Sequence, residues 1–179
     1  MIPIPTPAPA LDDLDRRILD VLQEDASVSN VELADRVHSS PPTCLRRVAR
    51  LKASGVIERQ VAIVSPQALG PTLTAIVEVT LEHQGEDRQQ AFATRAGVES
   101  AVLQCYRVSP GPDFVLVVQV ADMPGYHAFA QRMFGAGTNV RNVRTYFCLA
   151  RIKFDTRIAR LPEQLRQSFH TTMVPPAGE

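Results

Sequence analysis

The chain has 179 residues, of which 45% are hydrophobic, and its 19 Lys and Arg residues are balanced by 19 Asp and Glu residues. This length allows one large domain or two small ones, and the apolar content is sufficient for ordinary hydrophobic cores. A formal net charge of +0 excludes a protein that binds nucleic acid through its overall charge, so any such function must depend on a local basic surface.

The three cysteines, Cys44, Cys105 and Cys148, are far apart, and none belongs to a CxxC pair or stands near a histidine at ligand spacing. This argues against a metal site and a disulfide framework and favours free thiols in a reducing compartment. No basic flank with a long apolar run opens the chain, and no stretch approaches the roughly 20 apolar residues of a membrane span. We therefore expect a cytoplasmic protein with no membrane partner, metal or cofactor.

The N-terminal residues 1–10 alternate proline with small residues, which predicts an extended, disordered arm. An amphipathic helix is expected next, from apolar residues at helical spacing. These residues are Leu14, Ile18, Val21 and Leu22. Asp12 or Asp13 can cap the start of this helix.

Residues 29–55 show the pattern of two short helices separated by a tight break. Ser29 and Glu32 fit a capping box at the start of the first helix. Ser40 is the expected cap of the second helix, and Pro41 stands at its first helical position, where a missing N–H costs nothing. The pair is expected to form a helix-turn-helix.

The second helix is apolar on one side and basic on the other. A helical wheel places on the apolar side Cys44, Leu45, Val48 and Leu51. Between residues 40 and 54 there are four Lys or Arg residues and no Asp or Glu, and Gly55 ends the helix. Such a helix can enter a DNA major groove, where arginine contacts guanine edges and phosphates. The alternative is an ordinary surface helix with a solvated basic face.

We predict that this unit binds double-stranded DNA in a sequence-specific manner. The cap, the short turn, the proline start and the acid-free face agree with each other, which favours DNA recognition over a solvated surface helix. The predicted contacts are Asn30, Ser40, Thr43, Arg46, Arg47, Arg50 and Lys52.

Residues 56–64 are rich in β-branched side chains and predict a short hairpin. Three helices followed by a small hairpin form a winged helix-turn-helix, which we assign to residues 11–64. A Ser-Pro and a Gly-Pro dipeptide then mark a hinge over residues 65–72.

The rest of the pattern alternates strands and helices in the order βαββαβ. Strands are expected at 73–81, 98–108, 113–120 and 140–154, and helices at 87–96 and 124–134. This order predicts a ferredoxin-like domain over residues 73–154, with one sheet and two helices on one face, and an α+β fold for the chain. The bare face of the sheet predicts a dimer. The tail, 155–179, is unassigned apart from a short helix expected around 161–169.

Four stretches of the sequence resemble the Lrp/AsnC family of leucine-responsive and asparagine-responsive feast/famine transcription regulators. They are LDDLDRRILDVLQEDASVSNVELADRV, SPPTCLRRVARLKASGVI, CYRVSPGPDFVLVVQVADMPGY and VRNVRTYF, and they cover nearly all of residues 11–154 in the family's order and spacing. The resemblance implies DNA binding as dimers or larger rings, often octamers. It also implies a ferredoxin-like domain of the RAM type that binds small effectors, typically amino acids, in clefts between subunits.

The same resemblance implies where an effector is bound. The family's Gly-x-x-Asp-Tyr/Phe turn appears as Gly111-Pro112-Asp113-Phe114, so Asp113 is the expected contact for an effector ammonium group. The full predicted set is Arg107, Gly111, Asp113, Met123, Tyr146, Phe147 and Cys148. Each also has an ordinary structural role open to it: Asp113 can cap a turn, and the others can pack in strands or the core. Asn139 stands where the family often has glycine, and asparagine still tolerates the left-handed conformation.

Arg107 departs from the leucine-binding relatives, which have an apolar residue at its position. If Arg107 faces the cleft, an effector with a second acidic or polar group should bind better than an aliphatic amino acid, because arginine binds a carboxylate with two hydrogen bonds. If the side chain instead points out of the sheet, it is simply solvated.

The leading interpretation is a transcription regulator that responds to an amino acid. An alternative is an amino-acid-binding regulatory subunit of a metabolic enzyme, and another is an interaction protein whose helix-turn-helix no longer binds DNA. The sequence contains no HxxEH, GxSxG or phosphate-loop motif, so no catalytic residue is expected.

Overall fold

The computed structural model describes residues 10–159, and in that range the chain forms two compact units. The helical unit comprises residues 10–61 and 154–159, and the sheet unit comprises residues 62–153. The helical unit is therefore built from two separate stretches of sequence, with the sheet unit inserted between them. Most of the proline-rich arm and the helix expected around 161–169 lie outside the described residues.

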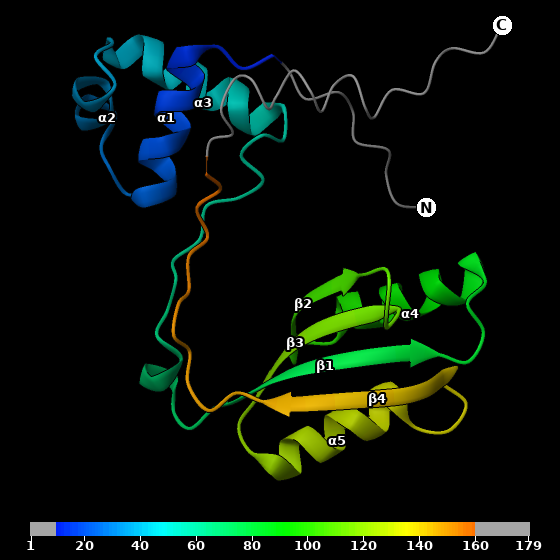
Figure 1. Ribbon diagram of the computed structural model, residues 1–179. Helices are drawn as coiled ribbons and strands as arrows, with labels where there is room; N and C mark the ends of the chain where they lie inside the picture. The colour runs from blue at the N-terminus through cyan, green and yellow to red at the C-terminus, as the bar shows by residue number, and fades with distance from the viewer. Residues whose placement is uncertain (1–9, 160–179) are drawn as a thin grey trace, which may run out of the picture. The chain divides into compact units, whose positions relative to one another are not determined.

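The helical unit contains the three predicted helices: α1 (Asp13–Glu24), α2 (Asn30–Arg36) and α3 (Pro41–Ala53) (Figure 1). Their buried residues form one core: Ile18, Val21, Leu33, Ala34, Val37, Cys44 and Leu51. Leu45, which the helical wheel placed on the apolar side, is 63% exposed. The wheel prediction was wrong there because Arg47, rather than Leu45, turns toward α1.

Three of the expected helix ends are confirmed, and the fourth, at Ser40, is confirmed only in position. The Ser29 hydroxyl caps α2 by accepting a 3.2 Å hydrogen bond from the Glu32 amide, which is one half of the expected capping box. Asp12 caps α1 by accepting a 2.9 Å hydrogen bond from the amide of Asp15, and Gly55 follows α3 with a φ of +74°. That left-handed conformation is one that glycine adopts without a steric penalty. Ser40 makes no side-chain cap, because its hydroxyl is instead 2.8 Å from the hydroxyl of Thr43.

The expected hairpin over residues 56–64 is wrong. Residues 58–65 are extended without strand pairing, and a 3₁₀ helix, η1 (Pro66–Leu69), follows. The β-branched side chains of Val61, Ile63 and Val64 are exposed. Because they have no apolar surface to pack against, nothing stabilises a two-stranded hairpin, which is marginal on its own.

The sheet unit has the predicted βαββαβ order. Its elements are β1 (Leu73–Leu81), α4 (Glu86–Val98), β2 (Val102–Arg107), β3 (Phe114–Val120), α5 (Met123–Phe134) and β4 (Val140–Phe147). All the strand pairs are antiparallel, and the strand order β2-β3-β1-β4 is visible in Figure 1. The predicted ferredoxin-like fold is therefore confirmed.

Alternation along β1 separates the two faces of the sheet. Ala75, Val77, Val79 and Leu81 are buried. They form the core with Phe92 of α4 and Phe129 of α5 among others, so both helices cover this face. The expected fourth strand was too long: β4 ends at Phe147, next to the start of β1, where the Cys148 amide donates to the Thr74 carbonyl at 2.9 Å. Beyond that point β1 offers no further residues to pair with.

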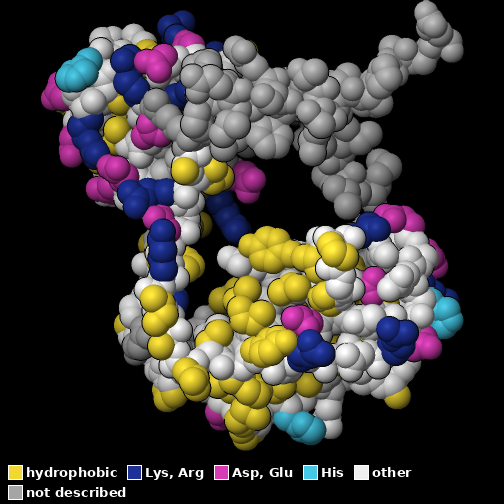
Figure 2. All heavy atoms as spheres, in the orientation of Figure 1, with side chains coloured by type: hydrophobic (Ala, Val, Ile, Leu, Met, Phe, Trp, Pro, Cys, Tyr) yellow, Lys and Arg dark blue, Asp and Glu magenta, His cyan; other side chains and the backbone are white. Residues whose placement is uncertain are grey.

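The opposite face of the sheet has no covering element within the described chain. It presents Ile76 and Tyr146 from one strand pair and Tyr106 and Val115 from another. Both tyrosines are about half exposed. Figure 2 shows hydrophobic side chains exposed over much of the sheet unit.

After β4 the chain continues without strand pairing to residue 159 and rejoins the helical unit. The amide of Ile158 donates to the side-chain carbonyl of Gln23 at 2.8 Å, and Arg157 lies 3.9 Å from Glu24. Both contacts are made at the C-terminal end of α1. No helix within residues 10–159 is long and apolar enough to cross a membrane.

Candidate DNA-recognition helix and effector pocket

The turn between α2 and α3 positions the N-terminus of α3. The side-chain amide of Asn30 donates to the carbonyl of Pro41 at 2.7 Å, and His38 adopts a left-handed φ of +53° within the turn. Asn30, predicted as a DNA contact, therefore already has a structural partner. Ser40 is exposed and Thr43 half-buried at the start of the helix.

One side of α3 is open to solvent and carries positive charge. Leu45, Arg46, Ala49 and Lys52 are exposed along it. Of these, Arg46 and Lys52 were predicted to contact DNA, and their exposure leaves both charges available to a polyanion. The helix carries no acidic residue.

Arg47 and Arg50 were also predicted as DNA contacts, but the structure places both beside α1. A guanidinium nitrogen of Arg47 lies 3.1 Å from one carboxylate oxygen of Asp15, and Arg50 contacts the other oxygen. Asp15 is 0% exposed. A buried carboxylate needs this compensation, because without it the unpaired charge would be strongly destabilising. Asp15 was not predicted from the sequence, where it reads as one of several acidic residues in α1.

Asp12 extends the same cluster, since Arg47 also contacts its carboxylate. The backbone amide of Asp15 and then the Arg47 guanidinium lower the pKa of Asp12 to about 2. Hydrogen bonding to Asp12 in turn raises the pKa of Arg47. Asp12 and Arg47 are therefore both ionised at neutral pH, and the cluster fixes α3 against α1.

The seven predicted effector residues are divided between two ends of the sheet. Asp113 follows the turn after β2, and its backbone amide donates to Val79, whereas Cys148 pairs with Thr74. Five residues of β1 separate these points, about 17 Å at ~3.4 Å per residue. Arg107 and Gly111 lie with Asp113, and Met123, Tyr146 and Phe147 lie toward Cys148. One chain does not bring the two groups together.

Asp113 has a structural role at its end of the sheet. Its carboxylate accepts a 2.7 Å hydrogen bond from the amide of Leu81 and a 3.3 Å bond from the side chain of Gln84. Gly111 allows the turn before it, with a φ of +123°. Asn139 has the tolerated left-handed φ of +59°, and its side chain bonds the backbone of His83.

The second group is more open. The Phe147 ring packs edge-on against Tyr126 with 5.0 Å between centroids, a favourable aromatic geometry. Tyr146, Met123 and Cys148 are exposed. Their side chains have surface available for a ligand or another subunit.

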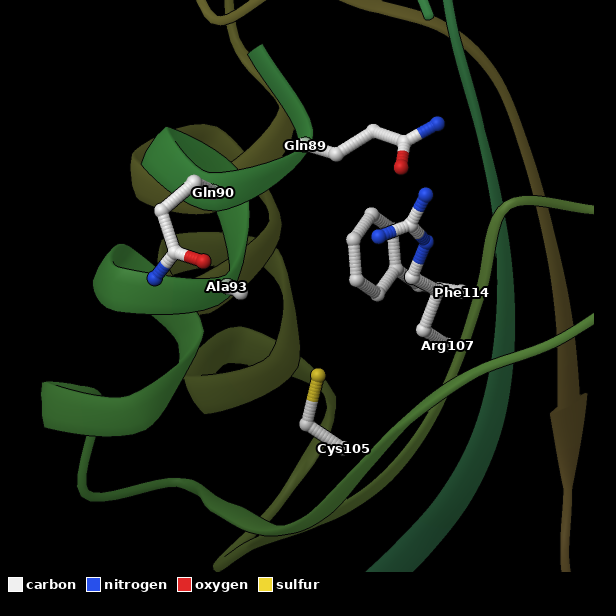
Figure 3. Close-up of a pocket in the computed structure, with 6 residues that line it drawn as sticks. All are labelled: Gln89, Gln90, Ala93, Cys105, Arg107 and Phe114. Carbon is white, nitrogen blue, oxygen red and sulfur yellow. The ribbon is translucent and has the colours of Figure 1, made fainter. Parts of the chain in front are cut away.

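A small pocket of about 150 Å³ lies between α4 and the strands β2 and β3. Figure 3 shows the side chains that line it: Gln89, Gln90, Ala93, Cys105, Arg107 and Phe114. Arg107 pairs with Phe114 across the strands, on the helix-covered face of the sheet. Burial raises the pKa of the Cys105 thiol, which is therefore neutral at neutral pH. Of the pocket residues, only Arg107 was predicted, because the others read as ordinary helix and strand positions.

Residues 11–58 match the winged helix-turn-helix DNA-binding family, and residues 74–158 match the Lrp/AsnC ligand binding domain. A Haemophilus influenzae protein named as an uncharacterized HTH-type transcriptional regulator is 40% identical over 148 residues, which span 83% of this chain and 88% of that protein. The chain belongs to the Lrp/AsnC family. The family resemblance drawn from the sequence is thereby confirmed.

Other Lrp/AsnC proteins are similar over comparable lengths. The leucine-responsive regulatory protein of Escherichia coli K12 is 35% identical over 152 residues, covering 85% of this chain and 93% of that protein. A Neisseria meningitidis transcriptional regulator, solved in complex with L-Met, superposes with a TM-score of 0.77 at 31% identity and covers 84% of this chain and 97% of that one. This Lrp/AsnC member is thus a helix-turn-helix transcription regulator with a ligand-binding domain.

Proposed function

We propose that the protein assembles from at least two copies, binds operator DNA through α3, and changes its DNA binding when an amino acid binds the sheet unit. The observation that carries the DNA-binding part is the acid-free outer side of α3. Arg46 and Lys52 are exposed on that side, while the buried carboxylate of Asp15 in α1 holds the helix through its other side.

The predicted DNA contacts divide into two roles in this proposal. Arg46 and Lys52 contact the DNA directly, with Ser40 and Thr43 at the N-terminal end of the helix. Arg47 acts as a positioning residue, because its guanidinium is held by Asp12 and Asp15. Arg50 is bound to Asp15 but has a half-exposed side chain, which leaves part of its guanidinium for a phosphate.

The amino-acid part is supported by the relatives: the Neisseria regulator was solved with L-Met, and the Escherichia coli relative is named as leucine-responsive. Assembly is supported by the uncovered face of the sheet and by the separation of the predicted effector residues. A second copy would cover that face, so a dimer meets the first need. Further copies, in a larger ring such as an octamer, would also place one chain's Asp113 end near another chain's Met123 end.

The DNA-binding proposal is tested by fluorescence anisotropy on DNA from upstream of the protein's own gene, over a range of salt concentrations. Arg46→Ala should weaken binding roughly 5- to 150-fold, or about 1–3 kcal/mol, if the side chain reads a base. If it contacts only phosphate, binding should fall on all sequences and the salt slope should drop by about 1. Arg88→Ala, on an exposed part of α4, is the matched control.

Parent-like affinity and salt dependence in Arg46→Ala would remove α3 from the DNA interface. Light scattering at micromolar concentration tests assembly, and a monomer would contradict it. A thermal-shift panel of the twenty amino acids tests the effector, since a ligand that binds the folded state raises its stability. The enzyme-subunit alternative has no comparable support, because the named relatives are regulators.

A further inference from the structure

We infer that Leu45 of α3 reads the operator by packing against the methyl group of a thymine in the major groove. This rests on the proposed contact between α3 and DNA. It adds a residue that determines sequence specificity through an apolar contact rather than a hydrogen bond. The sequence pattern placed Leu45 on the apolar side of the helix, so it does not belong to the predicted DNA contacts.

Leu45 is a large apolar side chain on the solvent side of α3. It is 63% exposed, whereas Cys44 and Leu51 of the same helix are completely buried in the core. Leu45 is the fifth residue of a helix that begins at Pro41, and it therefore lies in the N-terminal half of that helix. In helix-turn-helix proteins the N-terminal residues of the second helix contact base edges. Leu45 thus lies in the part of α3 from which a side chain reaches a base.

The contacts on the other side of α3 prevent Leu45 from turning into the core. Arg47 and Arg50 both bind the buried carboxylate of Asp15. A rotation of the helix that buried Leu45 would pull these guanidinium groups away from the carboxylate. A buried carboxylate without its partner is strongly destabilising, so the ion pairs fix the direction in which Leu45 points. Its exposure is a property of the folded helical unit.

The exposed line of α3 that contains Leu45 carries no hydrogen-bonding side chain. Pro42, Leu45 and Ala49 follow one another at successive turns of the helix, and all three are exposed. In the major groove, the apolar group on a base edge is the C5-methyl of thymine. The donors and acceptors of the other bases would be covered by these side chains without a hydrogen bond in return, which is costly. The line therefore favours a thymine.

The charges beside this line favour DNA over a protein as the partner of Leu45. Arg46 and Lys52 lie on either side of the line and are exposed, and α3 contains no acidic residue. A single exposed leucine is common on protein surfaces and needs no partner by itself. Here, however, phosphate contacts of the two cations would draw the helix into the groove and enclose Leu45 against the base edges.

The test uses DNA sites that the full-length parent protein selects from a random-sequence pool. Each thymine of the selected consensus is replaced in turn by deoxyuridine, which removes the methyl group and leaves the hydrogen-bonding groups of the base unchanged. Fluorescence anisotropy measures the affinity for every probe. At the thymine that Leu45 contacts, the replacement should weaken parent binding about 4-fold, the effect of one apolar carbon that is no longer buried.

Three variants connect this loss to Leu45. Leu45→Ala should bind the thymine and uracil probes equally at that position, because its shorter side chain no longer reaches the methyl group. Leu45→Met keeps a long apolar side chain and should retain the difference. Leu69→Ala, which shortens an exposed leucine of η1, is the matched control and should show the full difference. Retention by the Met variant, with a parent-like circular dichroism spectrum for Leu45→Ala, separates a lost contact from misfolding.

Two results would overturn the inference: equal losses in the parent and in Leu45→Ala at every thymine, or a parent that is insensitive to every replacement. If Arg46→Ala still weakens binding in either case, the proposed contact of α3 with DNA stands without Leu45. If Arg46→Ala also binds like the parent, both proposals fail. A pool that yields no consensus would contradict sequence-specific binding and, with it, the role of Leu45.

Discussion

Arg47 in the helical unit and Arg107 in the sheet unit were both predicted to bind a partner molecule, but their surroundings differ. Arg47 contacts two carboxylates of its own chain, and one of them, Asp15, is completely buried. Arg107 lines a pocket and pairs at 3.4 Å with the exposed carboxylate of Glu86.

This difference separates an arginine that holds the fold from one that is available to a ligand. A buried carboxylate cannot be solvated by water when its ion pair breaks, so its arginines are bound tightly. An exposed carboxylate can be solvated, so its arginine can exchange it for another partner at little cost in free energy. The burial of the partner, rather than that of the arginine, decides the role.

Removing the buried carboxylate should have the largest effect. Asp15→Asn leaves Arg47 and Arg50 without their shared charge, and we expect the free energy of unfolding to fall by about 2–4 kcal/mol. Urea unfolding followed by circular dichroism measures the change. Asp13→Asn is the matched control, since Asp13 is exposed and its ion pair within residues 10–159 is a 3.4 Å contact with Arg17. Its effect should stay within about 0.5 kcal/mol. Equal effects of the two variants would refute the comparison.

Arg47→Ala and Arg46→Ala should differ in kind. Arg47→Ala should lower both thermal stability and DNA affinity, with a smaller stability loss than Asp15→Asn because Arg50 still pairs with Asp15. Arg46→Ala should lower DNA affinity alone, because Arg46 is exposed. Thermal unfolding and anisotropy on the same samples distinguish them, and an Arg47→Ala protein with parent stability would argue that Arg47 contacts DNA directly.

Lowering the pH should weaken the ion pair between Asp12 and Arg47 and so destabilise the helical unit. The pKa of Asp12 is lowered to about 2 in the folded protein from an ordinary value of 3.8. Its ionised form therefore stabilises the fold above pH 4, and this stabilisation is lost as the pH falls from about 4 to about 2. Asp12→Asn keeps a capping side chain but cannot ionise. Urea unfolding at several pH values should show a shallower acid limb for the variant, whereas parallel curves would exclude this contribution.

The smallest effect is expected at the exposed pair. Glu86→Gln should change the free energy of unfolding by no more than about 0.5 kcal/mol, because the contacts are long and solvated. The same urea experiment measures it. A loss as large as that of Asp15→Asn would mean that Arg107 is held as firmly as Arg47.

Periodicity was enough to predict most of the fold. The pattern of residues 73–81 predicted both ends of β1 correctly, and the order of strands and helices predicted the ferredoxin-like sheet. The prediction of a hairpin over 56–64 was wrong because β-branched residues also occur in exposed, extended segments. The predicted end of β4 was wrong because a strand needs a neighbouring strand to pair with, and β1 ends at that point.

The candidate sites were harder to predict, because they depend on contacts between distant residues. The wheel of α3 contains no information about Asp15, which lies 32 residues before Arg47. The separation of Asp113 from Cys148 follows from strand register, which the sequence pattern leaves open. The orientation of the Gln89 side chain in the pocket depends on its hydrogen bond to the Gln84 carbonyl, which no sequence motif indicates.

The return of the chain to α1 has a consequence for synthesis. Gln23 and Ile158 are 135 residues apart, and a ribosome adding roughly 5–20 residues per second needs on the order of 10 s to make the stretch between them. The three helices can pack while the sheet unit is still being translated. The contacts of Arg157 and Ile158 with α1 must wait for nearly the whole chain, so the unit that is begun first is completed last.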